Sequence, residues 1–212
     1  MNKGVVSVLV AYLIWGLYPF YFHAMQHVAP TEIVIHRVLW TFALLAVYLF
    51  CSRRWRWIQK AVTDRRTVAV FLMSSVLITA NWSTYTYAIV TNQTLEASLG
   101  YFMNPLVSVL LGTVFLKEKL NKAQMLAIVF ACAGVMWVTF KQGEFPALGL
   151  TLALSFGFYG LVRKMAPLGS LEGLTLETAF AFPVALLATF YFAGNGDLTF
   201  VHGTSWDKFW LI

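Results

Sequence analysis

The stretch Leu95–Leu120 reads LEASLGYFMNPLVSVLLGTVFLKEKL, and it decides the class of fold. Between Glu96 and Lys117 it contains twenty residues without a charge. That length lets one helix cross a hydrocarbon core of about 30 Å. Pro105 cannot donate a hydrogen bond to the carbonyl of Tyr101, so this carbonyl needs a partner that lipid does not offer. We therefore expect this helix to be packed in protein or to line a wet cavity.

The composition of the whole chain is that of an all-α polytopic membrane protein. Hydrophobic residues make up 59% of the 212 positions and charged residues 11%, whereas in soluble domains about a quarter of the residues are charged. The net charge of +6 does not indicate a nucleic-acid partner, because the basic residues lie between apolar runs and follow membrane topology. Cys51 and Cys132 both fall in predicted spans, so we expect no disulfide framework, metal site or cofactor.

Seven apolar runs are predicted to cross the bilayer. Their approximate bounds are Gly4–Phe22, Ile33–Cys51, Thr67–Ala88, Ala97–Leu116, Ala123–Phe140, Pro146–Val162 and Leu174–Ala193. The first run has no A-x-A cleavage site and is expected to remain in place. Ser52–Arg66 is expected to be a short basic loop. An eighth span begins near Asp207 and stops at Ile212, which is too short to cross, so we expect the chain to be a fragment of a longer protein.

Lysine and arginine are distributed unevenly over the connections between these runs. Alternate connections, counted from the N-terminus, carry Lys3, Arg53, Arg54, Arg56, Lys60, Arg65, Arg66, Lys117, Lys119, Lys122, Arg163 and Lys164. The opposite connections carry only Lys141. Positive residues gather on the cytoplasmic side of membrane proteins, so this asymmetry places the N-terminus in the cytoplasm.

An internal repeat is indicated by Trp15–Tyr18 and Phe156–Tyr159, which align at an offset of 141 residues. The same offset pairs His36 with Glu177. Chance similarity between apolar spans is the alternative explanation. A true repeat divides the chain into a five-span unit at 1–141 and an incomplete, inverted second unit at 142–212. Two full units predict a parent protein of roughly 280–300 residues with ten spans.

Five segments of the chain resemble the EamA transporters of the drug/metabolite transporter superfamily, and more narrowly the RarD proteins. They are Tyr12–Tyr18 (YLIWGLY), Glu32–Trp40 (EIVIHRVLW), Asn81–Trp82, Leu95–Pro105 and Ala153–Lys164 (ALSFGFYGLVRK). The resemblance implies ten helices in two inverted five-helix repeats, of which about seven and the start of an eighth are present. It also implies a multi-pass protein of the bacterial inner membrane with both termini cytoplasmic. One departure is Lys117, where we expect a glycine before Glu118, and it puts the cytoplasmic turn in doubt.

Charged residues near the outer face are candidates for gating or proton coupling. His36 and Arg37 lie one turn inside the second span, where charge is expensive and usually faces a cavity or a partner. Arg37 could pair with an anionic group of a substrate, and His36 could exchange protons near neutral pH. Alternatively, Arg37 extends to the outer interface and pairs with Glu32. Glu96 has two interpretations. Its carboxylate could interact favourably with the dipole of the helix that it begins, or it could pair with Arg37 and form a gate.

Glu177 is the corresponding candidate near the cytoplasmic face, one turn inside the seventh span. A partly desolvated carboxyl group at that depth is typical of proton relays. The alternative is a glutamate near a helix N-terminus, which the helix dipole stabilises.

Polar and aromatic residues in the third, fourth and sixth spans are candidates for the substrate pathway. They are Asn81, Trp82, Tyr85, Tyr101, Asn104 and Tyr159. The spacings of four between Asn81 and Tyr85 and of three between Tyr101 and Asn104 place each pair on one helix face. The alternative is hydrogen bonding between helices and anchoring at the interface. Predicted helix breaks that let helices bend between states are Pro19, Pro105 and Pro183.

The function that these features favour is secondary transport of a small organic solute across the lipid bilayer by alternating access. Proton coupling is a hypothesis that rests on His36 and Glu177, and export is the favoured direction. The chain has no G-x-x-x-x-G-K-[ST] motif, so ATP is not expected to drive transport directly. An enzyme is not expected, because neither H-E-x-x-H nor G-x-S-x-G occurs. A non-transporting membrane scaffold or sensor is the alternative.

Overall fold

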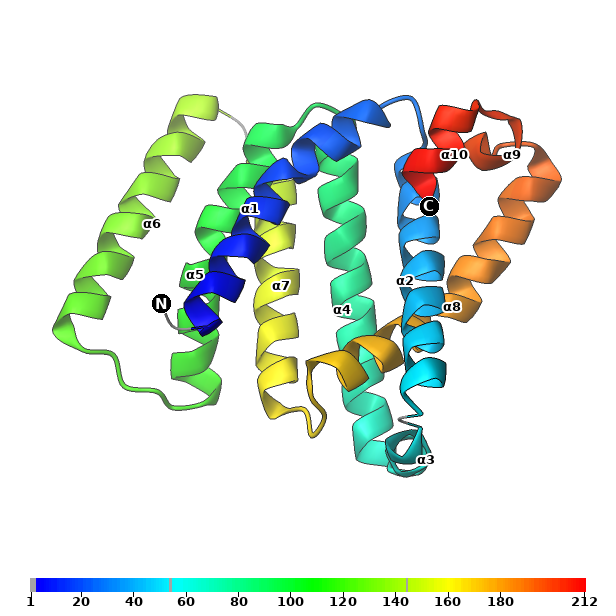
Figure 1. The fold of residues 1–212 in the computed structure, drawn as a ribbon. Coiled ribbons are helices and arrows are strands. Elements are labelled where there is room, and N and C mark those ends of the chain that lie inside the picture. The colour runs from blue at the N-terminus through cyan, green and yellow to red at the C-terminus, as the bar shows by residue number, and fades with distance from the viewer. Residues whose placement is uncertain (1–2, 54, 144) are drawn as a thin grey trace.

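The computed structural model describes residues 3–53, 55–143 and 145–212, and within these ranges every regular element is a helix (Figure 1). The helices are α1 (Lys3–Ala24), α2 (Pro30–Ser52), α3 (Arg56–Thr63), α4 (Arg65–Val90), α5 (Thr94–Phe115), α6 (Lys122–Gln142), α7 (Ala147–Met165), α8 (Ser170–Asn195), α9 (Thr199–His202) and α10 (Ser205–Leu211).

Six of the described helices have the length and hydropathy to cross a membrane: α1, α2, α4, α5, α6 and α8. The protein is therefore a polytopic membrane protein, as its composition predicts. The predicted span Pro146–Val162 forms α7, which is not one of the six, since Arg163 and Lys164 in its last turn lower its mean hydropathy. The ten-helix inverted repeat stays a prediction.

The long helices alternate in direction, as Figure 1 shows. The α1–α2, α4–α5 and α6–α7 connections lie at one end of the bundle, and the α2–α4, α5–α6 and α7–α8 connections lie at the other. We call the latter the basic end, because its described connections and helix termini carry most of the lysine and arginine residues. These are Arg53, Arg56, Lys60, Arg65, Arg66, Lys117, Lys119, Lys122, Arg163 and Lys164.

Helices α4, α5 and α7 pack together in the middle of the bundle (Figure 1). Glycines bring α5 and α7 into close contact: a Cβ atom on Gly100 would lie 2.8 Å from the carbonyl oxygen of Gly149. Likewise, a Cβ atom on Gly157 would lie 2.6 Å from Cγ1 of Val107. Small residues permit this approach of helix backbones in membrane proteins.

Helices α1 and α6 lie at the margin of the bundle and bury few side chains. No residue in the apolar window of α6 is buried. Helix α1 is attached through its last turns, where Phe22 joins the core formed with Ile33, Tyr85 and Ala88. The large apolar surfaces that remain exposed on both helices require an apolar environment, and a lipid bilayer supplies one.

One prediction about a connection was wrong. The expected loop Ser52–Arg66 contains the helix α3, whose Ala61 packs against Phe71 and Leu176. Its opposite face carries exposed Arg56 and Lys60, so α3 is a short amphipathic helix. A helix does begin near Asp207, as predicted: α10 starts at Ser205, and the short helix α9 precedes it.

The three prolines predicted as helix breaks interrupt no helix. Helices α1, α5 and α8 continue on both sides of Pro19, Pro105 and Pro183, respectively. Helix α5 packs on α7, but Pro105 and Tyr101 are exposed, so the packed or wet environment expected at this break stays a prediction. A role of the three prolines in bending stays a prediction.

Candidate functional site

Arg37 lies among aromatic side chains contributed by α1, α4 and α5. Its Cζ atom lies 4.2 Å from the centroid of the Trp82 ring and 5.8 Å from that of the Tyr18 ring. Tyr85 and Tyr101 are within electrostatic range of the guanidinium group, and their own ring centroids are 5.7 Å apart in an edge-on contact. We call Arg37, Tyr18, Trp82, Tyr85 and Tyr101 the arginine cluster.

The arginine cluster lies at one depth in the bundle. At 1.5 Å per residue, the Cα atoms of Tyr18, Arg37, Trp82 and Tyr101 lie about 9 to 12 Å along their helices from the nearer helix end. Those four helix ends lie at the end opposite the basic end (Figure 1). The guanidinium group lies over the Trp82 ring at this depth.

Arg37 forms no ion pair within the part of the chain that the structure describes. Glu32 instead accepts hydrogen bonds from two backbone N–H groups in the first turn of α9, at 2.7 and 3.0 Å. Glu96 accepts one from the backbone N–H of Leu148 in the first turn of α7, at 3.1 Å. Both carboxylates therefore accept hydrogen bonds from backbone N–H groups that have no partner within their own helix. A gate formed by Glu96 and Arg37 is not formed in this conformation and stays a prediction.

The energetics of Arg37 are those of an incompletely compensated charge. A charged side chain at the centre of a transmembrane helix costs about 2.5–3.5 kcal/mol on insertion scales. A desolvated cation–π contact returns about 2 kcal/mol. The aromatic rings therefore offset part of the cost, which leaves Arg37 able to gain from an additional anionic partner.

His36 is buried, with 5% of its surface exposed. Its ring packs on Phe200 of α9, with 4.6 Å between ring centroids and 39° between ring planes. Within the described residues neither ring nitrogen has a hydrogen-bond partner. His36 thus faces α9 and not the arginine cluster, although the two residues are adjacent in sequence.

Glu177 is held in a second cluster, between α4, α7 and α8. Its carboxylate accepts hydrogen bonds from Ser74 Oγ at 2.5 Å and from the Tyr159 hydroxyl at 3.3 Å. The Nε atom of Arg163 lies 3.6 Å from Oε1, and Glu177 itself is 1% exposed. We call these four residues the glutamate cluster. Gly173 leaves room for the Arg163 guanidinium group, which a Cβ atom there would overlap.

The two asparagines predicted to line a pathway have different surroundings. Asn81 is buried and donates hydrogen bonds to the Leu152 carbonyl at 3.1 Å and to Ser155 Oγ at 3.0 Å. These bonds join α4 to α7, as the alternative interpretation expected. Asn104 is half-buried, and its Oδ1 accepts a hydrogen bond from Ser108 Oγ at 3.5 Å on the same helix.

The aromatic residues predicted to line a pathway therefore fall into two clusters, and the two asparagines belong to neither. Tyr101 lies in the arginine cluster, whereas Tyr159 lies in the glutamate cluster. Ser74 and Trp82 are eight residues apart on α4, which separates the clusters by about 12 Å along that helix. Asn81 lies between them on α4. No hydrogen bond joins His36 to Glu177 within the described residues, so the proposed repeat-mates belong to separate surroundings.

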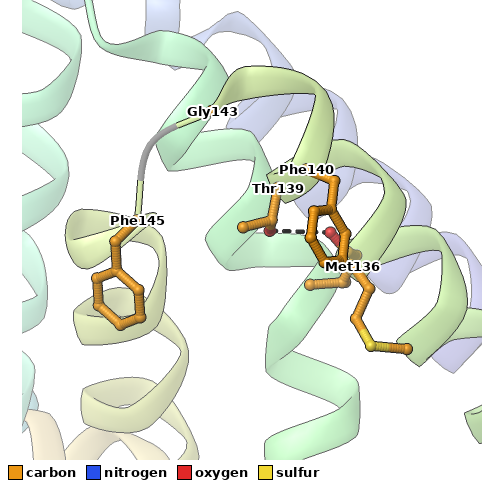
Figure 2. A pocket seen from close by; sticks show the side chains of 6 residues that line it. Met136, Thr139, Phe140, Gly143 and Phe145 are labelled. Carbon is orange, nitrogen blue, oxygen red and sulfur yellow. Dashed lines mark hydrogen bonds between the residues drawn. The ribbon is translucent and has the colours of Figure 1, made fainter.

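An apolar cavity of about 330 Å³ lies beside the last turns of α6, away from both clusters. Figure 2 shows Met136 and Phe140 on α6 and Phe145 across from them, ahead of α7. The hydroxyl of Thr139 is engaged with the Val135 carbonyl at 2.9 Å. The cavity offers little polar chemistry to orient a solute, so the polar clusters are the better candidates.

Sequence reasoning missed three participants in these clusters: Tyr18, Ser74 and Arg163. Arg163 was counted only as a topology residue, because it follows an apolar run. The adjacent serines Ser74 and Ser75 in an apolar helix were a usable signal. Ser75 Oγ donates to the backbone carbonyl of Glu177 at 2.7 Å, so the serine pair binds α8.

A helical bundle with charged side chains buried among its membrane-length helices is the architecture of a polytopic transporter or channel. The EamA-like transporter family matches residues 2–140, and the chain belongs to this family.

Several bacterial proteins are similar to this chain. The uncharacterized transporter YojE of Bacillus subtilis (strain 168) is 42% identical over 188 residues, which cover 87% of this chain and 63% of that protein. The uncharacterized transporter PA0485 of Pseudomonas aeruginosa is 37% identical over 212 residues, covering 100% of this chain and 71% of that protein. Protein RarD of Escherichia coli (strain K12) is 39% identical over 194 residues, covering 92% and 66%. No solved structure matches the chain.

Proposed function

We propose that the protein to which this chain belongs is a secondary transporter that moves a small organic solute across the membrane by alternating access. The observation that carries the proposal is Arg37, a cation held inside the bundle by aromatic rings from three other helices. Charged residues within membrane spans are expensive and mark solute pathways. Membership of a transporter family supports the same class of function.

The arginine cluster is proposed as one wall of the solute pathway. Trp82, Tyr85 and Tyr101 supply amphipathic rings that suit an organic solute. Asn104 follows Tyr101 by about one turn on α5 and extends the polar surface toward the basic end. In another conformation, Glu96 would leave the first turn of α7 and pair with Arg37, closing the pathway at the end opposite the basic end.

The chain is proposed to hold one complete five-helix unit at 1–141 and part of an inverted second unit at 142–212. The family match over residues 2–140 supports a unit of this length. The chain spans 63% to 71% of the length of the relatives named above, which supports a longer parent with further helices. Two inverted units are a common basis for alternating access.

The basic end is proposed to face the cytoplasm of a bacterial cell, with the N-terminus on that side of the inner membrane. Its lysine and arginine content supports this orientation, and the bacterial origin of the relatives supports the location. Export is the proposed direction.

Proton coupling is proposed to involve His36 and Glu177 at separate places. Protonation of Glu177 would weaken its attraction for Arg163 and loosen the contact between α7 and α8. His36 would gain a charge beneath Glu32, which lies one turn away on α2. Transport in proteoliposomes that does not respond to an imposed pH gradient would contradict the coupling and leave the transport function intact.

The experiment that tests transport compares the culture medium of cells with and without the full-length protein by mass spectrometry. We expect at least one small organic solute to accumulate in the medium only when the protein is present. Arg37→Gln should abolish this difference at unchanged expression. Arg56→Gln is the matched control, because Arg56 is exposed on α3. A membrane scaffold or sensor would leave the medium unchanged, and that result would contradict the proposal.

A further inference from the structure

We propose that the arginine cluster is a binding subsite for small organic monoanions, namely monocarboxylates with a planar or aromatic body whose carboxylate binds Arg37. The inference rests on the proposed transport function and specifies the substrate class of the same site. It follows from the geometry of the guanidinium group, from the charge around it and from the rings beside it.

One face of the Arg37 guanidinium group is covered, and its edge carries the remaining donors. Trp82 covers the face, at 4.2 Å from Cζ to the ring centroid. No hydrogen bond from the guanidinium N–H groups is found among the described residues. The edge of a guanidinium group presents N–H donors in a plane, in a spacing that matches a carboxylate. An anion approaching along this edge would form two parallel hydrogen bonds without displacing Trp82.

The arginine cluster carries one positive charge, which a ligand with a single negative charge would neutralise. Within the described residues, Arg37 is the one cationic side chain of the cluster, and the neighbouring His36 is turned toward Phe200. The other members are neutral aromatic residues. A monocarboxylate would balance the cluster, whereas a phosphate dianion would leave an excess negative charge, and an organic cation would be repelled.

The aromatic rings favour a planar body attached to the carboxylate. Tyr101 is 51% exposed, and Tyr18 and Trp82 are half-buried, so the cluster keeps aromatic ring surface that the described residues do not cover. Tyr85 is buried and packs edge-on against both Tyr101 and the core residue Phe22, each at 5.7 Å between centroids. This backing holds the available rings in place, and such rings stack on planar solutes.

The test uses purified full-length protein in lipid nanodiscs and matched pairs of probes. Benzoate is compared with benzamide, and phenylacetate with phenylacetamide, by calorimetry and thermal shift. Benzylamine and inorganic phosphate complete the panel. We expect the carboxylates to bind the wild-type protein at least about tenfold more tightly than their amides, because only the carboxylates are charge-paired with Arg37. Benzylamine and phosphate should not bind.

Variants then assign the binding to Arg37. Arg37→Gln should remove the preference for acid over amide, Arg37→Lys should retain part of it, and Arg56→Gln should leave it unchanged. Amides that bind as tightly as acids, a preference for phosphate or benzylamine, or an acid preference that survives Arg37→Gln would each overturn the proposal. If the Arg37→Gln protein fails to fold, the comparison of acid and amide on the wild-type protein still decides.

A counterflow assay with labelled benzoate in proteoliposomes separates this inference from the transport function. Arg37-dependent binding without any flux would support the subsite and contradict transport. Flux of neutral or cationic solutes that does not depend on Arg37 would support transport and contradict the subsite.

Discussion

The guanidinium group of Arg37 lies over the indole ring of Trp82, with 4.2 Å between Cζ and the ring centroid. The two residues come from α2 and α4, so the contact fixes the relative position of two membrane-length helices at the depth of the arginine cluster. It also keeps a cation inside the bundle without a carboxylate partner among the described residues.

We expect this contact to appear as a coupling energy in a double-mutant cycle. Arg37→Leu and Trp82→Leu, made singly and together in the full-length protein, should be non-additive by about 1–2 kcal/mol, because each single change already removes the cation–π contact. The coupling energy is obtained from denaturant-induced unfolding, in detergent, of the wild type, the two single variants and the double variant. Strict additivity would contradict a direct energetic link between the two side chains.

The glutamate cluster should be more sensitive to a single change than any exposed acidic residue. Glu177→Gln leaves the partly buried Arg163 guanidinium group without a charged partner, and we expect a loss of stability below the about 3–5 kcal/mol that breaking a fully buried pair costs, but larger than that of an ordinary helix-terminal carboxylate. Chemical denaturation of the variant measures the loss. Glu172→Gln, in the first turn of the same helix, is the control, with an expected effect of about 0.3–1 kcal/mol. Equal losses of stability from the two changes would show that the pair of Glu177 with Arg163 contributes no more than an ordinary glutamate in the first turn of a helix.

Lys117 adopts a left-handed backbone conformation with φ of 55° directly after the end of α5. The N–H of Glu118 donates to the carbonyl of Gly112 at 3.2 Å and closes the turn, and glycine is the residue usually found at a left-handed position after a helix. Lys117→Gly should therefore raise stability by about 1 kcal/mol. Thermal unfolding measures it, and Lys119→Gly, at a position without positive φ, should not stabilise. This is the turn where the resemblance to EamA transporters led us to expect a glycine.

Asp64 should contribute a pH-dependent term to stability at the basic end. It caps the N-terminus of α4, and hydrogen bonds from the Thr67 side chain and then the Thr67 backbone lower the pKa of its carboxyl group. A pKa that is lower in the folded state than in the unfolded state stabilises the protein above the unfolded value. That contribution is lost as the pH falls through the folded value.

Melting temperatures measured between neutral and acid pH check this prediction. The difference between wild type and Asp64→Asn should be largest at neutral pH and should shrink in acid, since protonated Asp64 resembles asparagine. Asp197→Asn, in the α8–α9 connection, is the control. A difference that stays constant with pH would contradict a charge-dependent cap.

The positions of the long helices could be predicted from the sequence, because each apolar run is bounded by polar, charged, proline or glycine residues. Helix α3 could not. Its residues 56–63 are too few for a recognisable period, and the cluster in which Ala61 is buried includes Leu176, from a helix much further along the chain.

The residues of the candidate site were predicted better than their partners were. Arg37 and Trp82 were both identified, but their contact depends on how α2 packs on α4, which spacing along one helix does not determine. The pair of Glu32 with Arg37, which was the alternative interpretation, is absent from the described residues for a local reason. Residues five apart lie on different faces of a helix, and the residue one turn below Glu32 is His36. Tyr159 was grouped with Tyr101 by type, whereas packing assigns it to Glu177.

The central claim is that a solute passes the arginine cluster, and flux through the reconstituted full-length protein tests it most directly. The solute that accumulates in the medium of expressing cells is labelled and its counterflow measured in proteoliposomes. We predict flux for wild type and Arg56→Gln, and a fall of at least about tenfold for Arg37→Gln at equal protein content. Wild-type flux in Arg37→Gln would contradict the claim.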